Sequence, residues 1–275
     1  SYLGRAADLG NSAALDLAGR HYLYGRGCEI DDEKAFNFFN SAVALGEEPA
    51  NLHLAVCYFK GYGTEIDYKS AFNCFMEAEP HSWGSTYYLG ECYRSGLGVP
   101  KDQKKAFELY LSGAEAGLTN CLFALGRAYY YGEGVSEDDE EAVKWFTLAA
   151  EKNETEAKFY LGRCHYAGLG VPEDADLGLK LMRGAAQEGC EEAETYLFEE
   201  GFSVEVDNQE ETDGETTNEI PTLARDPSER ARDLHRKLSS GNESSGQKTA
   251  QILSFRKGST EGIDRLMSED EDSTN

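Results

Sequence analysis

Residues 125–135 read LGRAYYYGEGV, and the pattern of this stretch recurs along the chain. A leucine is followed after four positions by a tyrosine, and then by two glycines with one residue between them. The five glycine pairs are Gly25/Gly27, Gly61/Gly63, Gly96/Gly98, Gly132/Gly134 and Gly168/Gly170. Their first members are separated by 36, 35, 36 and 36 residues, and a near-fixed interval of this length indicates a repeat protein.

Each repeat reads as two helices joined by a glycine turn. In the first helix a small residue, the leucine and the tyrosine recur in steps of four, which places them on one face. The glycines end this helix, because a helix C-terminus favours a left-handed residue that glycine adopts without strain. An aspartate six residues after the first glycine suits the N-cap of the second helix. These aspartates are Asp31, Asp67, Asp102, Asp138 and Asp174.

The second helix of each repeat carries a pair of bulky residues that we expect to face the core. The pairs are Phe38–Phe39, Cys74–Phe75, Leu109–Tyr110, Trp145–Phe146 and Leu181–Met182. Together with the first helix, this pattern predicts an all-α fold of helix–turn–helix repeats.

The repeat resembles the Sel1-like repeat family, whose pattern is A-x-x-x-L-G-x-x-Y-x-x-G-x-G-V-x-x-D-x-x-K-A-x-x-W-x-x-x-A-A. Residues 121–150 show it most fully, with Cys121 in place of the first alanine. Three positions depart from it: Cys74 stands at the tryptophan position, His165 at the tyrosine position and Gly178 at an alanine position. The resemblance implies a TPR-like, right-handed superhelical solenoid of stacked helical hairpins.

We place the solenoid at residues 11–201, with repeats near 14–46, 50–80, 85–118, 121–153 and 157–189 and a closing helix at 190–201. Residues 1–10 read as the end of a preceding, truncated repeat, so we expect further residues before Ser1. Residues 202–275 are rich in serine and acidic residues and poor in large apolar ones. A segment of this kind buries too little surface to offset chain entropy, and we predict a disordered tail.

Charge and composition exclude several classes of function. With 51 acidic and 26 basic residues, the net charge is −25, which argues against nucleic-acid binding. No apolar run is long enough for membrane insertion. We expect a cytoplasmic protein, although a secretory or mitochondrial address stays an alternative because residues before Ser1 are expected. The oligomeric state is left open.

No catalytic, cofactor or metal site is predicted. The seven cysteines are odd in number and include no C-x-x-C pair. No strand precedes the glycine turns, so they read as helix caps rather than phosphate loops. Cys164 stands beside His165, but Ala128 fills the cysteine position in another repeat, which favours packing over chemistry. A disulfide between Cys57 and Cys74 is a weaker alternative.

The candidate binding surface lies on the first helix of each repeat, opposite its leucine. The resemblance implies that these helices line the concave side of a solenoid, where a protein or peptide binds. The candidates are Arg20, Tyr24, Lys60, Tyr87, Glu91, Phe123, Arg127, Tyr131, Phe159 and Arg163. Aromatic residues and arginine are common hot spots of interfaces. The alternative is that the aromatic residues pack against the next repeat.

We therefore predict a non-catalytic scaffold or adaptor. The resemblance implies work in complex assembly, signalling or protein quality control. One alternative is a regulatory or targeting arm of an enzyme whose catalytic domain lies before Ser1, and a weaker one is a redox protein that uses its cysteines. Ser239, Ser259 and Ser268 resemble kinase sites in the tail, where a phosphate would add charge.

Overall fold

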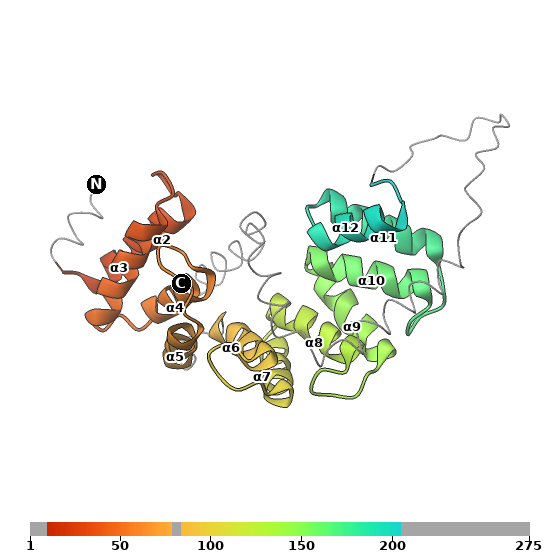
Figure 1. The fold of residues 1–275 in the computed structure, drawn as a ribbon, viewed down its shortest axis with the longest axis horizontal. Helices are drawn as coiled ribbons and strands as arrows, with labels where there is room; N and C mark the ends of the chain where they lie inside the picture. The colour runs from red at the N-terminus through yellow and green to blue at the C-terminus, as the bar shows by residue number, and fades with distance from the viewer. Residues whose placement is uncertain (1–9, 79–83, 205–275) are drawn as a thin grey trace. The chain divides into compact units, whose positions relative to one another are not determined.

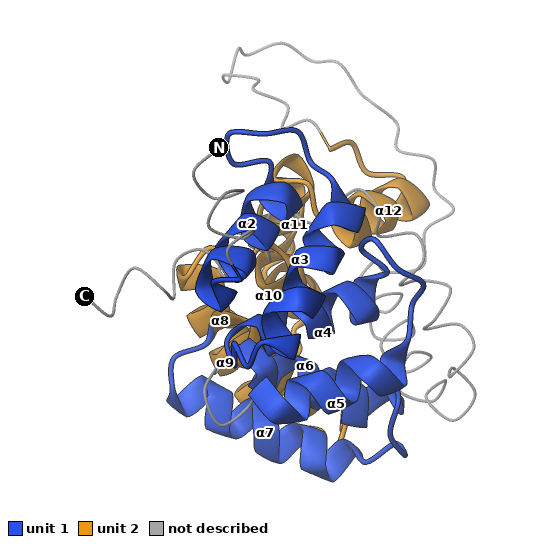
Figure 2. Ribbon diagram, turned by 90° about the vertical axis from the view of Figure 1, so that its left-hand side faces the viewer, with its two compact units in different colours: residues 1–118, 249–275 blue, residues 119–248 orange. Residues whose placement is uncertain are grey.

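A computed structural model describes residues 10–78 and 84–204, and this part of the chain is helical, with eleven helices (Figure 1). The described residues form two compact units, unit 1 with residues 10–78 and 84–118 and unit 2 with residues 119–204 (Figure 2). The expectations for residues 1–9 and for 205–275, including the three serines, lie outside the described residues.

The described helices follow one another as antiparallel pairs joined by short turns. Unit 1 contains α2 (Ser12–Tyr24), α3 (Asp32–Ala44), α4 (Ala50–Lys60), α5 (Tyr68–Ala78), α6 (Gly84–Ser95) and α7 (Gln103–Glu115). Unit 2 contains α8 (Thr119–Tyr131), α9 (Asp139–Glu151), α10 (Thr155–Ala167), α11 (Ala175–Gln187) and α12 (Glu191–Glu200). The predicted first and second helices of the repeats are therefore the even- and odd-numbered helices.

An aspartate side chain begins each second helix, as predicted. In α3, α7, α9 and α11 the cap carboxylate accepts a hydrogen bond of 2.9–3.0 Å from the backbone N–H three residues later. Asp67 accepts from two backbone N–H groups before α5 and from the hydroxyl of Ser70, at 2.6 Å. These bonds satisfy donors that the first turn of a helix leaves without an intrahelical partner.

The second glycine of the turn brings neighbouring repeats together. A Cβ at Gly98, where φ is +73°, would lie 2.2 Å from the backbone oxygen of Tyr68. Gly63 and Gly170 approach the start of the preceding second helix equally closely, with distances of 2.1 and 2.3 Å to a backbone oxygen. At Gly27 the space around a Cβ is open. The second glycine is thus required for its left-handed φ and, in these three repeats, for close packing.

The second helices bury only one member of each bulky pair. The fully buried members are Phe39, Phe75, Tyr110, Phe146 and Met182. The first members are half-buried, and Phe38, Cys74 and Leu109 still pack against the core clusters, so both residues face the core but only one is fully buried. Neighbouring side chains on a helix point about 100° apart, and only one can face the first helix directly. At that contact a Cβ on Gly126 would lie 2.5 Å from the Phe146 ring, which explains the glycine after the leucine.

Aromatic stacking joins one repeat to the next within each unit. The Tyr88 ring stacks on Phe75 with centroids 4.8 Å apart, and His53 stacks on Phe39 at 5.0 Å. In unit 2 the Tyr160 ring lies 5.3 Å from Phe146. Each contact is worth roughly 0.5–1.5 kcal/mol beyond its buried area. The described residues form an all-α solenoid, as predicted, and its right-handed twist stays a prediction.

Candidate functional site

The candidate binding residues divide between the two units. Unit 1 holds Arg20 and Tyr24 on α2, Lys60 on α4, and Tyr87 and Glu91 on α6. Unit 2 holds Phe123, Arg127 and Tyr131 on α8, and Phe159 and Arg163 on α10. Each set has its own surroundings within one unit.

In unit 1, Arg20 belongs to a buried charged cluster. Its Nε lies 3.2 Å from one carboxylate oxygen of Asp16, which is 4% exposed. The Nδ1 of His53 lies 3.1 Å from the other oxygen. A buried carboxylate needs such partners, because its desolvation is otherwise costly. The contact between α2 and α4 is therefore that of Asp16 with His53, and Arg20 pairs with Asp16 within α2. Nearby Tyr24 has the Arg26 guanidinium 5.5 Å from its ring centroid.

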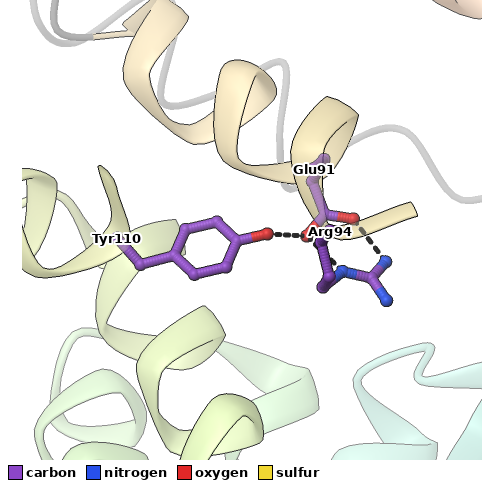
Figure 3. Close-up of polar contacts among 3 residues, drawn as sticks. All are labelled: Glu91, Arg94 and Tyr110. Carbon is purple, nitrogen blue, oxygen red and sulfur yellow. Dashed lines mark hydrogen bonds and ion pairs between the residues drawn. The ribbon is translucent and has the colours of Figure 1, made fainter. Parts of the chain in front are cut away.

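Glu91 is the centre of a second network in unit 1 (Figure 3). Its carboxylate accepts a hydrogen bond of 2.7 Å from the hydroxyl of Tyr110. Arg94 donates to both carboxylate oxygens, through Nε at 3.1 Å and Nη2 at 2.6 Å. Burial raises the pKa of Tyr110 well above its usual value, and the charge of Glu91 raises it further. Glu91 thus connects the two helices of its own repeat. The other two candidates of unit 1, Tyr87 and Lys60, are half-buried.

In unit 2, the three candidate residues of α8 are half-buried. The Arg127 guanidinium lies 5.8 Å from the centroid of the Phe123 ring, in cation–π geometry. The Tyr131 hydroxyl donates to the Tyr160 hydroxyl at 3.2 Å. We name the surface formed by Phe123, Arg127, Tyr131, Phe159 and Arg163 the aromatic–arginine face.

The α10 part of the aromatic–arginine face is buried. Phe159 and Arg163 are 4% and 3% exposed. The Phe159 ring lies 5.8 Å from Tyr196 of α12, and Phe123 lies 5.6 Å from Tyr160 of α10. These aromatic residues do pack against the next helix pair, which was the alternative weighed from the sequence. The surface that remains accessible is mainly that of α8.

Sequence reasoning missed the position directly before the repeat leucine. It holds the buried aromatic side chains of His53, Tyr88, Tyr160 and Tyr196, buried Ala124, and Leu17, which is 38% exposed. His53, Tyr88 and Tyr160 pack against a ring of the preceding helix pair. Tyr196 packs against the Arg163 guanidinium. The signal was present in the sequence, since three of these positions are tyrosine, but only the packing of successive repeats shows what they contact.

The cysteines are free thiols. Burial raises the pKa of the Cys57, Cys92 and Cys164 thiols to about 12, and that of half-buried Cys74 to about 11. Cys57 and Cys74 share a core cluster without a disulfide. Because only a thiolate is a strong nucleophile, the raised pKa disfavours a catalytic pair of Cys164 and His165.

Within residues 10–78 and 84–204, no group of three or more His, Cys, Asp or Glu side chains is arranged to hold a metal ion. None of the described helices has the length and apolar character of a membrane span.

The chain matches the Sel1 repeat family and solved structures of it. The family's sequence pattern matches residues 12–47, 49–78, 84–118, 119–154 and 155–190. A Sel1 repeat protein from Oxalobacter formigenes is 25% identical with a TM-score of 0.62, over 84% of this chain and 85% of that one.

A protective antigen of uropathogenic Escherichia coli that displays an SLR fold is 24% identical, with a TM-score of 0.58. That match covers 94% of this chain but 52% of the antigen, so the chain spans about half the length of that protein. No curated protein matches. The five matched segments together cover more than half of the chain, which therefore belongs to the Sel1 repeat family.

Proposed function

We propose that the chain is a non-catalytic adaptor that binds a protein or peptide on the accessible part of the aromatic–arginine face. The observation that carries this proposal is the arrangement of Phe123, Arg127 and Tyr131 along one side of α8. A half-buried guanidinium lies against an aromatic ring there, in a chain with a net charge of −25.

Family membership supports the class of function. Proteins with Sel1 repeats are generally protein-interaction scaffolds and are typically non-catalytic. Roles in complex assembly, signalling or protein quality control are what the family resemblance suggests for this chain. The helices of unit 2 offer a helical surface for such a role.

The accessible side chains of this face have contacts within the fold. Tyr131 is held by its hydrogen bond to Tyr160, and Arg127 by the Phe123 ring. Interface residues that are already fixed lose less side-chain entropy on binding, at about 0.5–1.5 kcal/mol for each side chain. Tyrosine, phenylalanine and arginine side chains that already have such contacts therefore suit a binding site.

A charge-reversal experiment tests the proposal. Proteins captured by the wild-type chain are compared, by quantitative mass spectrometry, with those captured by Arg127→Glu and Lys180→Glu. Lys180 is exposed on α11, so its reversal changes net charge equally at a helix outside this face. We expect Arg127→Glu to lose a partner that Lys180→Glu retains. Capture of the same proteins by both variants, with unchanged circular dichroism, would reject the proposal.

A further inference from the structure

Arg163 is a buried cation without a buried anion. Its guanidinium lies 5.7 Å from the ring centroid of Tyr130, 5.8 Å from Phe159 and 5.4 Å from Tyr196. These rings come from α8, α10 and α12, so the cation sits in an aromatic cage inside unit 2. Within the described part of the chain, no carboxylate forms an ion pair with Arg163.

Two nitrogens of this guanidinium have no hydrogen-bond partner. They are Nε and Nη2, and both are buried. The Tyr196 ring lies against the guanidinium, and the Nε and Nη2 donors stay unused. An unsatisfied buried donor is costly, and aromatic faces compensate the charge but accept no strong hydrogen bond.

Nε and Nη2 form one edge of the guanidinium, and the same edge is occupied elsewhere in this protein. Arg94 uses its Nε and Nη2 to hold both carboxylate oxygens of Glu91 (Figure 3). The planar guanidinium and the planar carboxylate match in this side-on geometry. The resulting pair of charge-assisted hydrogen bonds is stronger than a single neutral hydrogen bond. The unused edge of Arg163 therefore has the donor geometry of a carboxylate site.

We propose that this edge of Arg163 receives the side-chain carboxylate of a glutamate from the bound peptide. This inference rests on the proposed function, since it assigns the chemistry of the partner at the aromatic–arginine face. Because Arg163 is only 3% exposed, the ligand must reach it with a narrow side chain. Glutamate carries its carboxylate on two methylene groups and reaches further than aspartate.

The charges of the neighbouring helix α12 bear on the rest of the ligand. Helix α12, which packs against α10 and supplies Tyr196, carries five glutamates. They are Glu191, Glu192, Glu194, Glu199 and Glu200. Their repulsion disfavours a run of acidic residues, so the partner presents a single glutamate within a neutral or basic segment.

Nuclear magnetic resonance of arginine Nε–H groups tests the proposal. The Arg163 signal, assigned by its loss in Arg163→Lys, is followed during titration with acetyl-Gly-Gly-Glu-Gly-Gly-amide. We expect a saturable shift of this signal, and at least about tenfold weaker binding of the same peptide with glutamine, because the charged acceptor is lost. A peptide with glycine at the centre and a free C-terminus serves as the second control.

Three results would overturn the inference. They are no shift up to the solubility limit of the glutamate peptide, an equal shift with the glutamine peptide, or a shift with the free C-terminus alone. The variant Glu199→Gln tests whether a carboxylate of the chain itself already occupies this edge of Arg163. A change of the Arg163 signal in this variant without peptide would show that α12 already supplies the carboxylate.

The inference and the proposed function can fail separately. If Arg127→Glu loses a partner while the glutamate peptide leaves the Arg163 signal unchanged, the face binds proteins without a carboxylate at Arg163. If the glutamate peptide shifts the Arg163 signal, and Arg163→Lys also loses that partner and keeps the wild-type circular dichroism, both hold. Lysine retains the charge but lacks the planar fork, so this variant separates geometry from charge.

Discussion

Replacing Gly98 with alanine tests whether the second glycine of the turn is needed for its φ alone or also for packing between repeats. At φ +73° a Cβ costs about 1–2 kcal/mol in any turn. The new Cβ would also lie 2.2 Å from the Tyr68 oxygen and 2.9 Å from the Lys69 nitrogen. Both contacts are with backbone, so the turn must move away from the start of α5.

Overpacking of this kind costs about 1–3 kcal/mol, so the two terms together reach roughly 2–5 kcal/mol. Gly27→Ala is the matched control, because its φ is +75° and nothing lies within 4 Å of its Cβ. We expect that control to lose only the conformational term. Both glycines belong to unit 1, so one thermal or urea unfolding transition monitored by circular dichroism compares them.

Equal destabilisation by Gly98→Ala and Gly27→Ala would refute the packing argument, since the backbone approach would then contribute nothing. A larger loss in Gly27→Ala would contradict it more strongly. If only Gly98→Ala broadens or splits the unfolding transition, the turn is needed for neighbouring repeats to unfold together.

Three more measurements probe the networks of the described residues. Burial keeps most of the thiols protonated, so they react slowly. An aromatic disulfide reagent at pH 8 should therefore modify the exposed Cys28 first, and the buried cysteines only when the protein unfolds. Fast reaction of several thiols in the folded protein would contradict this expectation. Glu91→Ala removes the acceptor of the buried Tyr110 hydroxyl and should destabilise unit 1 by roughly 1–3 kcal/mol, whereas Glu91→Gln retains an acceptor and should cost less in urea titrations. Hydrogen bonds from Ser70 lower the pKa of Asp67 below 3.8, so the contribution of the carboxylate to folding stability is present above that pH and is lost as the pH falls through the lowered pKa. Asp67→Asn should therefore weaken the pH dependence of stability in acid. An acid unfolding curve that is the same for this variant and the wild type would count against the argument.

Local rules were enough to predict the helices and their ends. Aspartate caps and glycine turns depend on a few neighbouring residues, and the five-fold repeat made each signal visible several times. For the same reason the all-α fold followed from the interval between the glycine pairs. Which residue of each bulky pair is fully buried could not be predicted in this way, because it depends on how closely the two helices approach.

The candidate site was harder to predict because its contacts are distant in sequence. A helical wheel assigned Arg163 to the face opposite Leu161, where an isolated helix would expose it. In the fold, Tyr130 of the preceding helix pair and Tyr196 of α12 cover that position. Glu91 was assigned to the surface in the same way, although Tyr110 approaches it from 19 residues away.

Hydrogen–deuterium exchange of the chain, alone and with the partner lost in Arg127→Glu, tests the central claim most directly. The claim is that the partner occupies the aromatic–arginine face. It predicts added protection in Thr119–Tyr131 and Thr155–Ala167, the helices that carry this face. Protection confined to α9 and α11, with α8 and α10 unchanged, would contradict the claim.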